Sequence, residues 1–249
     1  GLCSARWCQS KCRQPVTLVG RRLPSARLAG LQWYTVSLCD VSFSEDVTHQ
    51  MSFSAVQNVI HTAGGLFDDL LKSQGVSSSR KCFQPKVTGL QRLLSLSMHP
   101  MRSFVSFSSI ASVIPTAGQA NYSAANSYMD HLCDRLRNTG IPTSSIQWGG
   151  WRELGMASRD RKVLQRLNRQ GLGTLTTAEG LAILNSVLIA DKLSFSRDSC
   201  VIASPFDLHK VNAMFERKSE IVAEDAAPSA TPLGKGVNAA TFLQSIKSR

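Results

Sequence analysis

The sequence lacks any long hydrophobic run. No apolar stretch in its 249 residues approaches the roughly 20 that a bilayer span requires. The opening residues, GLCSARWCQSKCRQ, also lack the continuous apolar stretch and cleavage site of a secretory signal. With 43% hydrophobic and 18% charged residues, the composition is that of a globular chain. We therefore expect a cytoplasmic protein of one domain plus a tail, with no membrane partner.

Cysteine pairs at the spacing of a structural zinc site are also missing. The chain has 7 cysteines, an odd number, and no two of them have the two-residue separation that such sites favour. We interpret them as buried free thiols and expect no metal.

Acidic residues are absent from the N-terminal end. The net charge is +11, from 28 Lys and Arg against 17 Asp and Glu, and no acid precedes Asp40. This bias predicts an anion near the N-terminal end. The options are nucleic acid, a phosphorylated cofactor or an acidic partner, and charge alone does not choose among them. Since no aromatic-interleaved basic stripe or recognition motif accompanies the charge, we expect no nucleic-acid partner.

Short β-rich runs alternate with helical stretches. Several runs, such as VTLVG and FVSFSS, are nearly continuous in apolar or β-branched residues, which is typical of parallel strands covered on both faces. The predicted strands are 16–19, 33–38, 56–61, 104–107, 144–148 and 201–203, and the predicted helices are 44–53, 85–98 and 122–138. The alternation predicts an α/β fold with a Rossmann-like, doubly wound parallel sheet.

The last part of the chain has a different composition. SEIVAEDAAPSATPLGKG mixes Glu, Ala, Pro, Ser and Gly without periodicity, as linkers do. We place a domain edge near residue 215, with a domain over 1–215 and a flexible linker or tail over 216–249.

Loops rich in small residues follow two of the predicted strands. In open α/β sheets ligands bind beyond the carboxyl ends of the strands. Ala63 and Gly64 follow one strand, and Gly149 follows another. Glycine lets the backbone approach a flat ligand closely, so we expect a cofactor face there.

A serine and a tyrosine are placed by a third strand. Ser109 follows the strand over 104–107, Tyr122 stands thirteen residues further on, and Asn126 follows Tyr122 by four. A spacing of four puts Tyr122 and Asn126 on one face of a helix.

Five ordered blocks resemble one known family. They are QPVTLVGRR, HTAGG with FDD behind it, FQPKVTG, the long block FVSFSSIASVIPTAGQANYSAANSYMDHL with GIPTSSIQWGGWRELGMAS, and VIASPFDL. Together they resemble the ketoreductase domain of modular polyketide and type I fatty acid synthases, a branch of the short-chain dehydrogenase/reductases. The resemblance runs from about Gly1 to Leu208.

The resemblance implies a catalytic tetrad. Tyr122 would protonate the carbonyl oxygen as hydride arrives, and Ser109 would hydrogen-bond the same oxygen. A phenol with an ordinary pKa near 10 needs a positive charge nearby to exchange protons efficiently near neutrality. Members of the wider family carry that lysine four residues after the tyrosine, where this chain has Asn126. The synthase branch exchanges the two positions, which makes Lys86 of Pro85–Gly89 the implied lysine.

The resemblance also implies NADPH as the cofactor. Arg21, with Arg22 as a helper, would bind its 2′-phosphate, because the planar guanidinium binds phosphate bidentately. Asp40 would lie near the adenine, although a turn or helix-start aspartate is an equally good interpretation. Ala63, Gly64 and Gly149 would complete the cofactor site.

Two features favour the D-configured, B-type alcohol. Asp68 and Asp69 resemble the Leu-Asp-Asp block of that class, and position 114 is Ile where the opposite class has Trp. The loop from His61 is one residue longer than usual, so which aspartate guides the substrate stays open. Trp151 is a further substrate-guiding candidate.

The N-terminus departs from the family pattern. The first strand and its Gly-rich turn, which cradle the pyrophosphate, have no counterpart before Gly1. We therefore expect a reductase fragment that by itself binds NADPH weakly or not at all.

The expected partners follow from the family. They are an acyl carrier protein, which presents a phosphopantetheine-linked β-ketoacyl group, and other synthase domains in cis. The basic stretch from Arg159 to Arg169 is a candidate for steering the carrier, although an ordinary solvated helix face is the simpler interpretation. The alternative function is a catalytically silent structural reductase fragment of a synthase.

Overall fold

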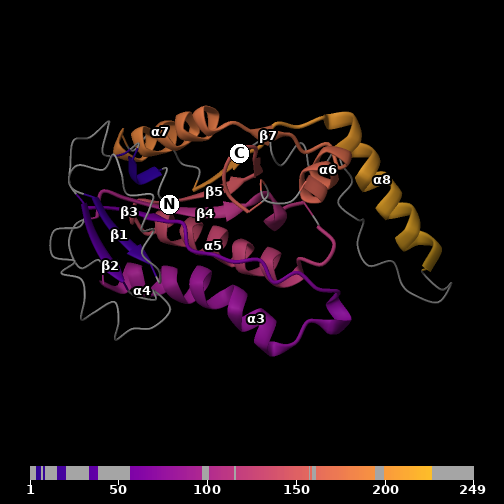
Figure 1. Cartoon of the computed structure of the whole chain (residues 1–249), viewed down its shortest axis with the longest axis horizontal. Coiled ribbons are helices and arrows are strands. Elements are labelled where there is room, and N and C mark those ends of the chain that lie inside the picture. The colour runs from indigo at the N-terminus through magenta and orange to yellow at the C-terminus, as the bar shows by residue number, and fades with distance from the viewer. Residues whose placement is uncertain are drawn as a thin grey trace. The chain divides into compact units, whose positions relative to one another are not determined.

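The computed structural model describes residues 4–6, 8, 16–20, 34–38, 57–96, 101–114, 116–156, 158, 161–193 and 199–225. The chain divides into two compact units. Figure 1 shows the helices and strands of the chain. The first unit comprises 1–148 and 178–203, and the second comprises 149–177 and 204–249.

A four-stranded parallel sheet organises the first unit. Its strands are β3 (Asn58–His61), β4 (Ser103–Ser109), β5 (Thr143–Trp148) and β8 (Cys200–Ala203), in the order β3-β4-β5-β8. All three pairings are parallel, and every residue of β5 is buried. The continuous burial explains the uninterrupted runs in the sequence. The predicted α/β fold with a parallel sheet is confirmed.

Two further strands lie near the start of the chain. They are β1 (Val16–Gly20) and β2 (Tyr34–Leu38), which pair in parallel as a two-stranded sheet. All six predicted strands are therefore present, each within about two residues of its predicted bounds.

Helix α5 (Ala120–Asn138) packs against β4 and β5. Ala125, Met129 and Cys133 repeat every four residues and are fully buried, so one face of the helix enters the core beside Phe104. The helix ends before Gly140, whose φ of 88° is a conformation that glycine adopts without strain.

The chain between β3 and β4 is almost entirely helical. It holds a short 3₁₀ turn, η2 (Leu71–Ser73), then α3 (Val76–Phe83), a π-helical segment, η3 (Gln84–Thr88), and α4 (Gly89–Leu96). A second 3₁₀ turn, η4 (Ile110–Ser112), follows β4. The predicted helix over 85–98 corresponds to η3 and α4.

Helix α7 (Thr177–Leu193) also belongs to the first unit from Ala178 onward. The second unit contains α6 (Arg161–Arg169), α8 (Leu208–Asp225) and a parallel pair of two-residue strands, β6 (Gly150–Trp151) and β7 (Thr174–Leu175).

Three helices were not expected from the sequence, namely α3, α7 and α8, whereas α6 corresponds to the basic stretch for which a solvated helix face was the simpler interpretation. Helix α8 also corrects part of the predicted linker, because residues 216–225 are helical and the expected edge near 215 lies inside this helix. Asp207 caps it, since its carboxylate accepts the Lys210 N–H at 3.3 Å and its carbonyl accepts the Val211 N–H at 3.0 Å. Its Ala, Met, Glu and Lys residues are good helix formers. The predicted helix over 44–53 lies outside the described residues.

The described part of the chain has no helix long and apolar enough to cross a membrane, and no group of ligands able to hold a metal. The described cysteines, Cys8, Cys82, Cys133 and Cys200, form no disulfide with one another; Cys82 and Cys133 are buried, whereas Cys8 and Cys200 are half-buried.

Candidate active site

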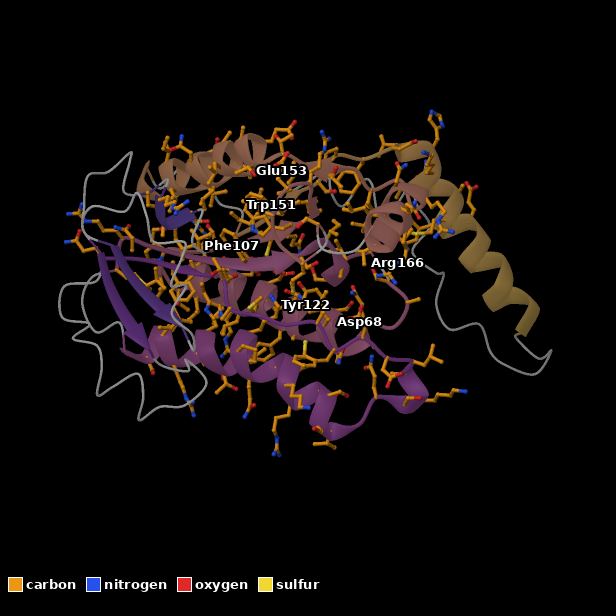
Figure 2. All side chains as sticks on the ribbon, viewed as in Figure 1. Asp68, Phe107, Tyr122, Trp151, Glu153 and Arg166 are labelled. Atoms are coloured by element: carbon orange, nitrogen blue, oxygen red, sulfur yellow. The ribbon has the colours of Figure 1, made fainter. Side chains whose placement is uncertain are left out.

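The first unit brings four predicted residues together at the carboxyl ends of its strands. Ser109 is the last residue of β4, and Lys86 lies in the π turn η3. Tyr122 and Asn126 occupy successive turns near the start of α5. Figure 2 shows Tyr122 at the start of α5 and Phe107 on the neighbouring strand β4.

Lys86 is buried against the tyrosine. Only 3% of its surface is exposed, and its ammonium lies 5.1 Å from the centre of the Tyr122 ring. Nζ donates a hydrogen bond to the Phe107 carbonyl oxygen at 3.1 Å. Burial lowers the pKa of Lys86 to about 8, while the nearby Cys82 and Asp130 act in the opposite direction. The side chain is therefore still mostly cationic at neutral pH.

Tyr122 is a buried, protonated phenol. Burial raises its pKa to about 12, although hydrogen bonding with the Ser109 and Asn126 side chains acts to lower it. The positive charge that the sequence led us to expect is present over the ring, but burial has the larger effect. At neutral pH the hydroxyl is therefore available as a proton donor.

The side chains of Ser109 and Asn126 each also form a hydrogen bond with a backbone group. Ser109 Oγ accepts the Ala111 N–H at 3.2 Å at the start of η4, so the serine also caps a turn. Asn126 Nδ2 donates to the Tyr122 carbonyl oxygen at 2.7 Å. Asn126 Oδ1 is buried and has no hydrogen-bond partner among the described residues.

The paired aspartates are tied to the start of α5. Gln119 Nε2 donates to Asp68 Oδ2 at 2.8 Å, and the Asp69 N–H donates to the Gly118 carbonyl oxygen at 3.0 Å. Asn121 Nδ2 donates to the Phe67 carbonyl oxygen at 3.0 Å. These bonds hold the loop after β3 beside the helix that carries the tyrosine, and Figure 2 shows Asp68 on that loop.

Three residues with amide side chains in this arrangement were not predicted from the sequence: Gln74, Gln119 and Asn121. Gln74 Nε2 donates to the carbonyl oxygens of Asp69 and Gly118, and its Oε1 accepts the Asn121 N–H. The one available signal was the GQANY block, which places Gln119 and Asn121 next to Tyr122.

A hollow of about 330 Å³ adjoins this loop. Asp69 and Leu71 line it, together with residues that lie between β4 and the first turn of α5: Ala111, Ser112, Val113, Thr116, Gly118, Ala120 and Ser123. Of the two aspartates, Asp69 is the one that faces this space.

Gly64 has a different neighbour from the expected cofactor. A Cβ at this position would lie 2.9 Å from Lys86 Cε, so the missing side chain makes room for the lysine. Ala63, beside it, is half-buried.

The remaining predicted residues are Arg21, Arg22, Asp40 and Gly149 for the cofactor and Trp151 for the substrate. Arg21, Arg22 and Asp40 lie outside the described residues. Gly149 and Trp151 belong to the second unit, where Trp151 is half-buried in β6.

The cluster fits a nicotinamide nucleotide in its polar groups. Asn126 Oδ1 is a buried acceptor without a described partner, and the Lys86 ammonium has N–H donors beyond the one given to Phe107. Such groups match the hydroxyls and the amide that this class of cofactor presents.

Comparison with known proteins adds independent findings. A family model described as the KR domain matches residues 1–153. The spectinabilin polyketide synthase system protein NorB of Streptomyces orinoci is 34% identical over 193 residues, which is 70% of this chain and 9% of that protein. The polyketide synthase GfsA of Streptomyces halstedii is 32% identical over 203 residues, or 76% of this chain and 3% of that protein.

Solved structures agree with these relatives. An A-type ketoreductase from a modular polyketide synthase superposes with a TM-score of 0.75 at 26% identity, covering 86% of this chain and 48% of that one. An A1-type ketoreductase, at 24% identity, shares the fold with a TM-score of 0.76 over 99% of this chain and 51% of that one. The chain thus spans about half the length of these reductases and a small part of the two synthases.

Proposed function

This chain belongs to the KR domain family of polyketide synthases, within the short-chain dehydrogenase/reductases, and we propose that the protein containing it reduces a carrier-bound β-ketoacyl thioester with NADPH. The product would be the β-hydroxyacyl thioester.

The observation that carries the proposal is the contact between Lys86 and Tyr122. Burying an ammonium 5.1 Å from the ring of a buried phenol costs folding free energy, because burial opposes charge, and such perturbed groups are concentrated at functional sites. Ser109, hydrogen-bonded to the same phenol, supplies the third group that carbonyl reduction requires.

The four residues have complementary roles in the proposed reaction. The Ser109 hydroxyl donates a hydrogen bond to the β-carbonyl oxygen and orients it. Tyr122 Oη gives its proton to that oxygen as the carbonyl carbon is reduced. Lys86 and Asn126 support the phenol and the return of a proton to it.

NADPH, when bound, supplies the hydride for the carbonyl carbon. Within the described site, Lys86 and Asn126 would hold the nicotinamide nucleoside end through the groups named above. The remaining proposed contacts are Arg21 and Arg22 with the 2′-phosphate, Asp40 near the adenine, and Ala63, Gly64 and Gly149 along the cofactor face.

B-type stereochemistry is part of the proposal. Its support is the loop that holds Asp68 and Asp69 beside the start of α5, and the buried Ile114 at the position where the opposite class has Trp. The Asp68 carboxylate accepts a hydrogen bond from Gln119 and the Asp69 carboxylate accepts the Leu70 N–H, so both aspartates stay candidates for guiding the substrate. Trp151 remains a proposed substrate contact.

An acyl carrier protein with a phosphopantetheine-linked substrate is the proposed partner, along with other synthase domains in cis. The support is that both relatives described above are polyketide synthase proteins far longer than this chain. The alternative, a catalytically silent structural fragment, does not require the four residues to meet, which argues against it.

Removal of the Tyr122 hydroxyl group tests the proposed function. In the complete protein, Tyr122→Phe should reduce ketone-dependent NADPH oxidation by about 10² to 10⁴-fold, the usual contribution of a general acid. Tyr128→Phe is the matched control, since Tyr128 lies on the same helix, is exposed, and accepts a hydrogen bond from Gln91.

The outcomes separate the candidates. Full activity in the control with loss in Tyr122→Phe supports the reductase. Absence of turnover in the wild type, with both a free ketone and a carrier-linked substrate, would favour the structural fragment.

A further inference from the structure

The backbone that carries Lys86 is irregular. Lys86 lies in the π turn η3, and Pro85 beside it has no N–H to donate. Single π turns within α-helices are rare and are frequent at functional sites. Within the helix the Lys86 carbonyl oxygen accepts only the bifurcated Gly89 N–H, which it shares with Gln84, so contacts from outside the helix add to the placement of this lysine.

His61 provides such a contact. It is the last residue of β3, is 3% exposed, and has its Nε2 3.1 Å from the Lys86 carbonyl oxygen. A carbonyl oxygen can only accept, so the imidazole must donate through an Nε2–H. Burial and the positive charge of Lys86 lower the pKa of His61 to about 4, so the ring is neutral at pH 7 and has one N–H to give.

The lysine side chain is confined by one residue in the loop after β3 and one residue on β4. Gly64, three residues after His61, leaves the space that Lys86 Cε fills. On β4, the Phe107 carbonyl oxygen accepts the ammonium. The distal end of the lysine side chain is therefore held at Gly64 and Phe107, and the Lys86 carbonyl oxygen is held by His61 from outside the helix as well as by the Gly89 N–H within it.

We propose that His61 is a positioning residue: by donating its Nε2–H to the Lys86 carbonyl oxygen, it sets where the Lys86 ammonium lies against Tyr122. The inference rests on the proposed function for its effect on turnover, but the geometry that it describes can be tested without turnover. Nothing in the sequence motif assigned this histidine a role.

The charged and titratable groups around Lys86 come from three elements. They are Cys82 on α3, Asp130 and Tyr122 on α5, and His61 itself on β3. Without the hydrogen bond from His61, the Lys86 side chain is expected to move toward water. Its pKa then rises toward the ordinary value near 10.

The first test compares three substitutions in the complete protein. His61→Leu removes the donor and keeps an apolar side chain, whereas His61→Gln keeps an N–H near the position of Nε2. Ser106→Ala is the control, because Ser106 pairs with His61 in the sheet register and its buried hydroxyl bonds to Ser145 rather than to the lysine. We expect kcat to fall about tenfold to a hundredfold in His61→Leu, the scale of a small misplacement, and to be largely retained in the other two.

The second test measures Lys86 directly. Acetic anhydride labelling across a pH series, read by mass spectrometry of the Lys86 peptide, gives the pKa of this amine whether or not the protein is active. The pKa should move from about 8 toward 10 in His61→Leu and stay near 8 in His61→Gln and Ser106→Ala. If His61→Leu does not fold, His61→Asn replaces it, since its donor is too short to reach the Lys86 carbonyl.

The labelling result decides the inference. An unchanged pKa and labelling rate at Lys86 in a folded variant without the donor would overturn it, even if turnover fell. A wild type without turnover would count against the proposed reductase, and the labelling series would still decide the role of His61.

Discussion

Burial acts on Lys86 and Tyr122 in opposite directions. It lowers the pKa of the lysine to about 8 and raises that of the tyrosine to about 12, because both shifts favour the neutral form. Near neutrality the lysine is still mostly protonated and the phenol fully so. The pair therefore holds its protons in the state that the proposed ketone reduction would consume, and the reverse oxidation would need a proton removed first.

The pH dependence of reduction follows from the lysine. As pH rises through about 8, Lys86 loses its proton, the relay to Tyr122 fails, and kcat for a free ketone should fall about tenfold for each further pH unit. Initial rates from pH 6 to about 10 check this. Lys86→Met should be nearly inactive throughout, and Lys81→Met, at an exposed position of α3, should keep the wild-type profile. A level wild-type rate up to pH 10 would contradict the assignment.

At the scale of elements, the turns between strands and helices hold the site together. The loop after β3 carries Gly64 against the lysine and Asp68 against Gln119, and it is joined to the start of α5 by backbone and amide hydrogen bonds. The second unit shows the same dependence on turns at Gly171, where α6 ends and the chain meets Asp207.

Substitution of Gly64 should separate activity from folding. In Gly64→Ala the new methyl group meets Lys86 Cε at 2.9 Å and displaces the flexible end of the side chain, so kcat should fall at least about tenfold with little loss of stability. Gly75→Ala is the matched control, because nothing lies within 4 Å of the added Cβ. Rates and thermal unfolding of both variants test this, and equal rates in the two variants would count against it.

Substitution by alanine should lower the free energy of unfolding by different amounts at two glycines with positive φ. Gly140 (φ 88°) follows α5 in open space, so Gly140→Ala should cost only about 1 kcal/mol of backbone strain. At Gly171 (φ 79°) an added methyl group would lie 2.7 Å from the Asp207 carbonyl oxygen, so Gly171→Ala should cost about 3 kcal/mol or more. Urea unfolding of each variant measures the difference. Similar costs would show that the turn at Gly171 relaxes freely.

At the scale of the molecule, the excess of positive charge is the main unassigned property. The net charge is +11, and α6 in the second unit has basic residues in its last turn, Arg166 and Arg169. Arg166 is half-buried and its Nε is buried, whereas Arg169 is exposed. The exposed arginine is therefore the better probe of the proposed steering of an acidic carrier.

Charge reversal at Arg169 should act on one substrate only. Arg169→Glu is expected to lower kcat/KM for a carrier-linked substrate about threefold to tenfold at low salt, and the effect should shrink as salt screens the charge. Reduction of a small free ketone should be unchanged. The same loss with both substrates, or a loss independent of salt, would refute steering.

Much of the fold could be predicted from local pattern. The six strands and the helix over 122–138 were predicted because burial of a strand on both faces, and a helical repeat ending in Gly140, leave direct marks in the sequence. Helix α7 left no such mark, since it is apolar on most sides and its first N–H bonds to the Glu153 carboxylate, 24 residues earlier in the chain. Helix α8 begins at a local cap, but its later residues have the composition of a linker.

The proposed chemistry was implied by the resemblance of five ordered blocks to the ketoreductase family, whereas motif spacing by itself puts only Tyr122 and Asn126 on one helical face and Ser109 at the end of a strand. How Lys86 reaches the phenol depends on tertiary contacts, since the space beside Gly64 and the hydrogen bond from His61 join the π turn to a segment that is distant in sequence. Tertiary contacts also distinguish Asp69, which faces the hollow, from Asp68, which is held by Gln119. The physical reason is that helical and strand periodicity are local properties, whereas burial, charge and close approach at a site depend on which strands lie side by side.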